Sequence, residues 1–471
     1  MITLTQKATS LASDLDTPIS VFLEKVGANG SGVLLESAEV GGRWGRYSLI
    51  GSGVLLKLWC EGGFLRVGTE AEGLMPLKSH EGLPFLMGLR KVSENLTLLP
   101  DGAFPELPPI TRALYGYLGY GVVGLMEPRL AKAAPPEGAE AAFILPHTIY
   151  LFDHIYRRLT ELRLPGKPLD SRVGGAGPRG PEGTRVSPSM EGHRELVLKA
   201  KELIGNGELI QLVLSVAFEE PFAGDPLGLY RALRRLNPSP YMFHLQLPEL
   251  SLIASSPEVL VSSDRDRLRL CPIAGTRPRG QSPKEDNLFE VELSGNVKEQ
   301  AEHVMLVDLG RNDLGRVAAP GTVKVERYMD VERFSHVMHL TSQIGARLKD
   351  GLDGVDVLSA TFPAGTVSGA PKIRAMELIG EMEPEPRGPY AGGLGWFGLD
   401  KGGVWLDFGI TIRAAWVRDG RVSYRAGGGL VYDSEPESEW RECLNKAAAI
   451  KEALGMVRDP GVREGKDVPT G

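Results

Sequence analysis

Two glutamate pairs, each with a spacing of three residues, constrain this chain more than any other feature of its sequence. The first pair, Glu299 and Glu302, lies in a stretch without proline, residues 296–316, whose apolar spacing predicts a helix. The second pair, Glu439 and Glu442, recurs near the C-terminus. Side chains three positions apart on a helix point the same way, so each helix would present two carboxylates on one face.

The surroundings of these carboxylates indicate a bound cation. On the first helix they lie beside Val304, Leu306 and Leu309, which favour burial, so a cation or protons must balance their charge instead of bulk water. Four carboxylates on two helices can converge on a hard divalent ion. Mg2+ fits because it prefers a few carboxylates, retained waters and substrate oxygens. The alternative is two solvated helix faces, since glutamate is common on protein surfaces.

Composition limits the partners and the compartment. The 471 residues are 42% hydrophobic and 24% charged, which is ordinary for a globular protein, and no apolar run approaches a membrane span. The first residues contain acids and no long apolar block, so we expect no signal peptide, no membrane partner and a cytoplasmic protein. Three distant cysteines fit a reducing compartment. A net charge of −7 argues against nucleic acid as a partner.

Turn-forming residues divide the chain into four parts. Residues 1–165 are expected to be β-rich, with a hairpin around the C-E-G-G turn. Residues 166–188 are rich in Gly and Pro and predict a linker or a mobile loop. Residues 189–456 contain both glutamate pairs, and residues 457–471 form a C-terminal tail.

Within residues 189–456, local signals predict several elements. A helix begins near Ser189, and a buried strand at 209–216 carries Gln211. Single strands are expected at 250–260, 404–417 and 422–432. The final helix is expected to direct three side chains to the core: Trp440, Leu444 and Ala447.

The segment G-T-V-S-G-A-P-K, residues 365–372, predicts a tight loop that leads into a helix, with Ser368 as its cap. Such a helix N-terminus attracts anions, although a simple cap is the alternative. A histidine such as His339, taken alone, is more often structural than catalytic, so it is a candidate acid or base only because of the residues around it. Glycines 427–429 can form an ordinary bulge. The cationic candidates are Lys372, Arg413 and Lys446. With Mg2+ and the Thr366 hydroxyl, this set favours a small polycarboxylate substrate.

These residues together resemble the chorismate-utilising enzymes, and within them the large components of anthranilate synthases. The similarity is dense from about residue 195 to 455. It is carried in family order by the motifs P-I-A-G-T-R, K-E-Q-A-E-H, D-L-G-R-N-D-L-G, F-S-H-V-M-H-L, G-T-V-S-G-A-P-K and E-W-R-E-C-L-N-K. Residues 1–165 match more loosely, mainly through L-L-E-S-A-E, and the linker does not match.

The resemblance implies an α+β fold in which two large β-sheets pack face to face with helices on the outside. It implies that residues 189–456 bind chorismate in a cleft and carry the catalysis. By motif, Glu302 and Glu442 would ligate Mg2+, and Glu299 and Glu439 would support the site. The metal would act on the ring carboxylate of chorismate as a Lewis acid.

Other roles also follow from the resemblance. Glu258 in S-S-P-E would be the acid that helps the C4 hydroxyl to leave, and burial would have to raise its pKa. His339 and Thr366 would lie near the departing pyruvate. The remaining substrate-binding residues would be Gly275, Thr276, Tyr390, Arg413, Gly427, Gly428, Gly429 and Lys446.

Two positions select the nucleophile within this family. Family members that add water carry a lysine where this chain has Gln211, and aminodeoxychorismate synthases carry one where it has Ala274. The resemblance therefore implies ammonia addition, giving anthranilate and pyruvate. A separate glutamine amidotransferase subunit would supply the ammonia in a hetero-oligomer, because no cysteine has a glutaminase setting. The alternatives are aminodeoxychorismate, isochorismate or salicylate synthesis, or a non-catalytic amino-acid sensor.

The resemblance also implies feedback inhibition by tryptophan at a pocket of the N-terminal regulatory part. Its walls would come from the L-L-E-S motif and from the segment N-P-S-P-Y-M-F. Carboxylate, hydroxyl and apolar side chains there suit an ammonium group and an indole. The residues are Leu35, Glu36, Ser37, Pro240, Tyr241 and Met242. Ordinary interdomain packing is the alternative.

Overall fold

The computed structural model describes residues 1–12, 15–37, 45–104, 106–170, 183–333 and 337–458. Within these ranges, 21 strands join into one antiparallel sheet, and β1 (Ile2–Thr5) pairs in parallel with β6 (Leu96–Leu99). Most of the predicted linker and tail lies outside the described residues. The end of the predicted linker forms a short strand, β10 (Arg185–Ser187), on the edge of β11 (Gln211–Pro221).

The path of the sheet begins at β10 and β11. It continues through β23 (Arg421–Leu430), β22 (Ala414–Arg418), β13 (Leu250–Ser256), β12 (Tyr241–Leu247), β3 (Gly32–Glu36) and β4 (Tyr47–Glu61). From β4 it passes through β8 (Ala141–Asp153), β7 (Ala113–Leu118), β20 (Gly393–Gly398), β21 (Val404–Ile410), β14 (Val259–Arg265), β15 (Arg267–Leu270) and β18 (Val337–Arg347). The strands at its sides are β2 (Lys7–Leu11), β5 (Phe64–Gly68), β9 (Arg158–Arg163), β16 (Ile273–Pro278), β17 (Lys324–Arg333) and β19 (Gly369–Ala370).

The long strands β4 and β8 make the sheet double over. The first part of β4 pairs with β3 and its second part with β5, while β8 pairs with β7 and then with β9. Gly53 lies at the change of partner with φ +66°, a conformation that glycine adopts without strain. The two halves of the sheet share a buried core that includes Val33, Tyr115, Phe243 and Leu394. The two expected sheets are therefore confirmed as two facing halves of one sheet.

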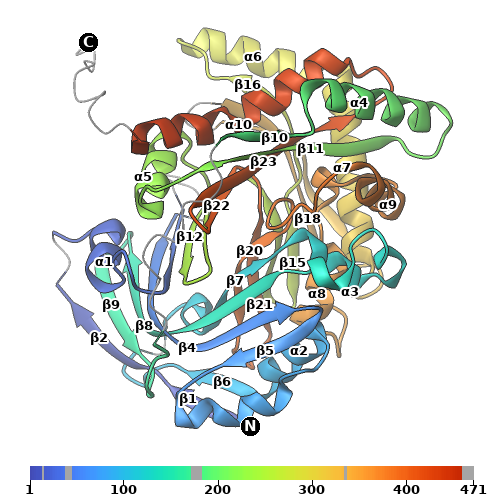
Figure 1. The fold of residues 1–471 in the computed structure, drawn as a ribbon. Helices are drawn as coiled ribbons and strands as arrows, with labels where there is room; N and C mark the ends of the chain where they lie inside the picture. Colours follow the sequence, from blue (N-terminus) through green and yellow to red (C-terminus); the bar gives the residue numbers. More distant parts are fainter. Residues whose placement is uncertain (13–14, 38–44, 105, 171–182, 334–336, 459–471) are drawn as a thin grey trace.

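Helices cover both outer faces. On one face lie α1 (Pro18–Lys25), α5 (Pro226–Leu236) and α10 (Pro436–Arg458), and on the other α2 (Phe85–Asn95), α7 (Val297–Gly315), α8 (Gly354–Thr361) and α9 (Lys372–Met382). Figure 1 shows α10 beside α4 (Met190–Gly205), over β11 and β23. The remaining helices are α3 (Val123–Met126) and α6 (Pro283–Gly295). Within the described ranges, no helix is both long and apolar enough to span a membrane.

The two predicted main parts share this sheet. Strand β3 from residues 1–165 pairs with β12, and β7 pairs with β20. Residues 1–165 and 189–456 are thus joined by backbone hydrogen bonds between these strands as well as by the linker. The division at residue 165 does not separate two sheets.

Several local predictions were wrong. The strand expected at 250–260 is two strands, β13 and β14, and the strand expected at 404–417 is also two, β21 and β22. Leu444 and Val304 are exposed, so neither faces the core as expected. Ser368 donates to the Ala364 carbonyl, and Pro371 instead occupies the cap position of α9.

Candidate active site

The α7 carboxylates lie beside strand β11. Helix α7 begins at Asn296, whose side chain accepts hydrogen bonds from the backbone amides of Lys298 and Glu299, both at 3.1 Å. One turn later, Glu302 accepts a hydrogen bond from Gln211 at 3.3 Å. Both predicted carboxylates therefore lie in the first two turns, where the helix dipole favours negative charge.

Glu302 experiences charge from both helices. Burial raises the pKa of Glu302, and the nearby carboxylates of Glu299 and Glu442 raise it further, whereas the Gln211 hydrogen bond and the Lys446 charge lower it. Glu299 has its own counter-ion, since Arg277 approaches it at 3.4 Å. Carboxylates on α7 and α10 that are more than 130 residues apart in sequence thus lie within electrostatic reach, as the sequence predicted.

The α10 carboxylates lie over the glycine strand β23. A Cβ atom added at Gly428 would meet Glu439 Oε2 at 3.1 Å and Glu442 Oε1 at 3.3 Å. Lys446 Nζ approaches Glu442 Oε1 at 2.7 Å and donates to the Gly427 carbonyl at 2.9 Å. A side chain at position 428 would therefore crowd both carboxylates, and they would have to move by a few tenths of an ångström.

Two features fit a hard divalent cation. Glu439 Oε2 is buried and accepts no hydrogen bond from any described residue, and burial raises the pKa of Glu439. The candidate ligands on α7 and α10 are all carboxylates, which is a ligand type that Mg2+ accepts. As placed, however, no three His, Cys, Asp or Glu side chains in the described ranges form a ready ligand cluster. Lys446 instead balances the charge of Glu442.

Glu258 lies in the break between β13 and β14 that the sequence did not predict. Burial raises the pKa of Glu258 to about 7, while the Thr366 hydroxyl and the Lys446 charge lower it. Glu258 and Thr366 also line a cavity of about 30 Å³, together with Gly365 and Pro272. The structure therefore brings Glu258 and Thr366 together beside the α10 cation.

His339 lies on β18, directly opposite Thr276 on β16. Its Nδ1 atom is 3.0 Å from the Gly275 carbonyl and 3.0 Å from the Thr276 hydroxyl. Because a carbonyl oxygen only accepts, Nδ1 carries the proton and Nε2 the lone pair. Burial lowers the pKa of His339; the Gly275 hydrogen bond raises it and Arg413 lowers it. His339 is thus a neutral imidazole at neutral pH.

Arg413 connects this histidine with the rest of the site. Its charge interacts with Tyr390 and Glu442 as well as with His339. Tyr390 is buried, and its hydroxyl would lie 2.9 Å from a Cβ atom added at Gly427. A Cβ at Gly429 would lie 2.4 Å from Gln211 Nε2. The three glycines thus let side chains from other elements approach the backbone of β23.

Lys372 does not join this site. Its ammonium group forms a buried ion pair with Asp313 at 2.9 Å and donates to the Thr361 carbonyl at 3.2 Å. It holds the start of α9 against α7 and α8. The sequence grouped Lys372 with Arg413 and Lys446, but only the last two lie among the other candidates.

A buried ion network behind the site escaped the sequence analysis. Glu383 pairs with Arg387 at 2.7 Å and with Arg425 at 3.2 Å, and it accepts hydrogen bonds from the Ser215 amide and hydroxyl. The Arg387 guanidinium also stacks over the Tyr390 ring, 5.7 Å from its centre. The members of the network are up to 210 residues apart, so no local pattern could have identified it.

The predicted tryptophan segments are neighbours. Strands β3 and β12 pair with Glu36 opposite Met242 and with Leu35 opposite Phe243. Glu36 and Met242 face the helices, whereas Leu35 and Tyr241 face the core between the two sheet halves. The four of these residues that lie in β3 and β12 therefore divide between two faces of the sheet.

Glu36 and Ser37 differ in their partners. Glu36 accepts a hydrogen bond from the Tyr230 hydroxyl at 2.6 Å and pairs with Arg234 at 3.2 Å. Its charge is thus already balanced within the protein. Ser37 Oγ is buried and contacts no hydrogen-bonding partner among the described residues. Pro240 is half-buried at the start of β12.

Comparisons with known proteins show the family of this chain. The family model for chorismate binding enzymes matches residues 69–452. Anthranilate synthase component 1 of Aquifex aeolicus is 39% identical over 96% of this chain and 94% of its own length. The Streptomyces coelicolor component 1 is 41% identical over 94% of this chain and 87% of its own.

Two solved structures share the fold. Anthranilate synthase component I from Streptococcus pneumoniae superposes with a TM-score of 0.69 and 30% identity, over 93% of this chain and 98% of that one. The menaquinone-specific isochorismate synthase of Escherichia coli gives a TM-score of 0.70 at 21% identity, over 96% and 95%, and supports the fold alone. The chain therefore belongs to the chorismate-binding enzymes and, within them, to the anthranilate synthase component 1 family.

Proposed function

We propose that this chain converts chorismate and ammonia to anthranilate and pyruvate in the presence of Mg2+. The observation that carries the choice of nucleophile is the Gln211–Glu302 hydrogen bond. A glutamine amide at this place cannot accept a proton from water, as the lysine of water-adding relatives would. Ammonia that arrives neutral needs no base, so Gln211 and Ala274 suit amination.

The oxygen ligands for Mg2+ would come from Glu302 and Glu442, with Glu299 and Glu439 in support. The ion would supply Lewis-acid chemistry at the ring carboxylate of the substrate. Arg413, the Tyr390 hydroxyl and the amides of glycines 427–429 would bind the pyruvyl carboxylate. Gly275, Thr276 and Lys446 would bind the remaining groups.

The reaction has two steps, an acid-assisted amination and an elimination of pyruvate. Ammonia attacks C2 while the C4 hydroxyl leaves as water, with its proton supplied by Glu258, giving aminodeoxyisochorismate. The pKa of about 7 keeps a large fraction of this carboxyl protonated near neutral pH. Loss of the C2 proton and transfer of a proton to the enolpyruvyl methylene then release pyruvate and leave aromatic anthranilate. His339 and Thr366 would assist this step.

Incubation of the purified chain with chorismate, Mg2+ and ammonium tests this proposal, because anthranilate is fluorescent. Chromatography with mass detection separates anthranilate from isochorismate, salicylate and aminodeoxychorismate. Formation of anthranilate with ammonium, and none with glutamine alone, is expected. Isochorismate as the main product would refute the proposed amination.

We further propose that tryptophan inhibits this reaction at the junction of β3 and β12. The buried Ser37 hydroxyl supports this proposal, since a bound amino acid could become its partner. Inhibition requires tryptophan to favour a conformation that binds chorismate less well, and linkage then makes the effect reciprocal. A tryptophan titration of wild-type and Ser37→Phe protein is the test. Unchanged inhibition in the variant would place the regulatory site elsewhere.

A further inference from the structure

Arg387 lies buried in the segment that connects α9 with β20, three residues before Tyr390. Its guanidinium donates two hydrogen bonds to the carboxylate of Glu383, from Nε at 3.0 Å and from Nη2 at 2.7 Å. It also donates to two backbone carbonyls, that of Val367 at 2.8 Å and that of Val213 at 2.7 Å. An arginine presents its donors in one plane, and here they join the end of α9, the strand β11 and the turn at residues 365–367.

Both carbonyls belong to segments that carry candidate site residues. Val367 directly follows Thr366 in the turn. Val213 lies on the same strand as Gln211, two positions away, and pairs with Gly429 in the sheet. A shift of the backbone at either carbonyl would therefore move a residue of the candidate site with it.

Two tyrosine rings lie beside the Arg387 guanidinium. Its central carbon is 4.8 Å from the centre of the Tyr120 ring and 5.7 Å from the centre of the Tyr390 ring. A planar cation is attracted to the face of an aromatic ring, and more strongly where water is excluded. The Tyr120 amide also donates to the Gly388 carbonyl at 2.9 Å. Arg387 and its neighbours thus connect residues 1–165 with the segment that carries Tyr390.

The Tyr390 hydroxyl is the group that these contacts orient. It lies beside β23, at 2.9 Å from the place of a Cβ atom added at Gly427. Burial raises the pKa of Tyr390 to about 12, and the Arg387 charge lowers it, so the hydroxyl keeps its proton at neutral pH. A protonated phenol can donate to a carboxylate, but only when its ring points in the right direction. The contact with Arg387 and the closeness of β23 together restrict that direction.

We propose that Arg387 is a positioning residue that holds the Tyr390 ring and the turn at residues 365–367 in the arrangement that binds the substrate. This inference rests on the proposed function, in which Tyr390 binds the pyruvyl carboxylate. The hydrogen bonds of Arg387 all go to protein groups, so it acts through Tyr390 and Thr366 and not on the substrate itself. Tyr120 supports the guanidinium from the first part of the chain.

Two substitutions weaken this positioning in different ways. Arg387→Lys keeps a positive charge beside Glu383 but loses the planar fork, so one ammonium group cannot replace all the contacts of the guanidinium. Tyr120→Leu removes an aromatic ring from beside the guanidinium, whereas Tyr120→Phe keeps it. The Tyr120 hydroxyl has no hydrogen-bonding partner among the described residues, so Tyr120→Phe breaks no hydrogen bond there. Tyr120→Phe is therefore the conservative variant.

Arg112→Lys is the matched control for a purely structural role. Arg112 is also buried, pairs with Asp400 at 3.0 Å and donates to the Leu107 carbonyl at 3.2 Å, and neither partner is a candidate site residue. Thermal melting measures the stability of every variant. Steady-state kinetics with ammonium at saturating Mg2+ give kcat and the KM for chorismate. Calorimetry with chorismate and Mg2+, without ammonium, gives the Kd of the substrate.

We expect Arg387→Lys and Tyr120→Leu to raise the KM and the Kd for chorismate at least ~10-fold, because Tyr390 would no longer be held in its binding orientation. Tyr120→Phe should resemble wild type in both constants. Arg112→Lys should lower the melting temperature but leave the KM for chorismate unchanged. A purely structural role of Arg387 would give that same result in Arg387→Lys.

Unchanged KM and Kd in both Arg387→Lys and Tyr120→Leu would overturn this inference. An equal loss of affinity in Tyr120→Leu and Tyr120→Phe, or a similar loss in Arg112→Lys, would also overturn it. If Arg387→Lys does not fold, the two Tyr120 variants decide the question. Wild type that binds chorismate but forms no anthranilate would refute the proposed amination, and the calorimetric comparison would still judge Arg387. Wild type that does not bind chorismate would refute both.

Discussion

Replacement of Glu258 by glutamine should abolish most activity and at the same time stabilise the folded protein at alkaline pH. The glutamine amide keeps the size and polarity of the protonated carboxyl, so it can remain next to Thr366. It cannot supply a proton to the C4 hydroxyl. We expect kcat to fall by about 100-fold or more, the scale of general acid catalysis.

The stability change follows from the pKa. Burial raises the pKa of Glu258 from 4.5 to about 7, so the folded protein keeps a proton that the unfolded chain releases above pH 4.5. The free energy of unfolding of wild type therefore falls as the pH rises from about 4.5 to 7. At ~1.4 kcal/mol per pKa unit, the loss reaches about 3 kcal/mol at pH 8. The Glu258→Gln protein has no such loss.

Urea denaturation at pH 5 and pH 8 measures this difference. The variant should be more stable than wild type by about 3 kcal/mol at pH 8 and by less than about 1 kcal/mol at pH 5. Asp407→Asn is the control, because burial also raises the pKa of Asp407 to about 7 and the Tyr241 hydroxyl donates to it at 2.7 Å. The advantage of this control over wild type should also grow by about 3 kcal/mol between pH 5 and pH 8, with anthranilate formation retained.

Either half of the prediction can fail separately. Equal differences in stability between variant and wild type at the two pH values would show that burial does not suppress ionisation of Glu258. Full turnover by the variant at pH 7 would show that another group protonates the leaving hydroxyl.

Three further substitutions probe the site and its support. Glu302→Gln should keep the melting temperature but lower Mg2+-dependent turnover more than ~100-fold, and full turnover at limiting Mg2+ would contradict the ligand assignment. Gly428→Ala adds a methyl group next to the α10 carboxylates and should lower kcat/KM at least ~10-fold. Gly455→Ala is the control, because a methyl group there meets nothing within 4 Å, and it should leave kcat/KM unchanged. Equal kinetics of the two variants would contradict the close approach of the carboxylates to β23. Glu383→Gln leaves Arg387 without its charge partner and should lower the free energy of unfolding by ~3–5 kcal/mol in urea, and a loss below about 1 kcal/mol would contradict a tightly paired network.

The sequence predicted elements best where local signals were strong. The absence of proline and the apolar spacing predicted α7, and the spacing of glutamates predicted their common face. Strand breaks were missed because the residues on both sides of them are apolar, which continues the pattern of a strand. One such break holds Glu258, and another holds Arg413 with φ +50°. At these two breaks the backbone leaves the extended conformation that a continuous apolar run predicts, and candidate site residues lie there.

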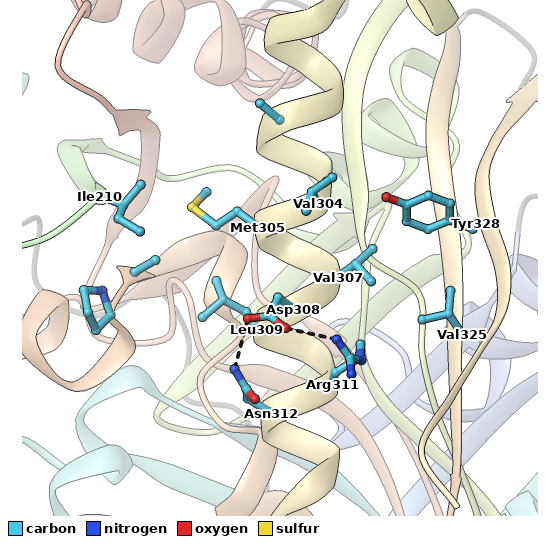
Figure 2. Close-up of a pocket in the computed structure, with 13 residues that line it drawn as sticks. Ile210, Val304, Met305, Val307, Asp308, Leu309, Arg311, Asn312, Val325 and Tyr328 are labelled. Atoms are coloured by element: carbon cyan, nitrogen blue, oxygen red, sulfur yellow. Dashed lines mark hydrogen bonds and ion pairs between the residues drawn. The ribbon is translucent and has the colours of Figure 1, made fainter.

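Long-range contacts account for the other differences. Val304 is exposed and lines a hollow together with Val325 and Tyr328 of β17 (Figure 2). An apolar residue in a sequence does not reveal which side of a helix will have a neighbour. Lys372 was grouped with the site cations because its charge alone was visible. Its partner Asp313 is 59 residues away, and burial of that pair follows from how α7, α8 and α9 pack.

The interleaved sheet affects when this protein acquires its site during synthesis. Strand β3 emerges from the ribosome about 200 residues before its partner β12. Strand β11 likewise emerges about 200 residues before its partner β23. Helix α10, the last described element, brings Glu439, Glu442 and Lys446. A nascent chain can therefore form hairpins early, but it has no complete carboxylate site until almost all of its residues are available. Slow translation near the C-terminus would prolong exposure of unpaired strand edges, the surfaces most prone to aggregation.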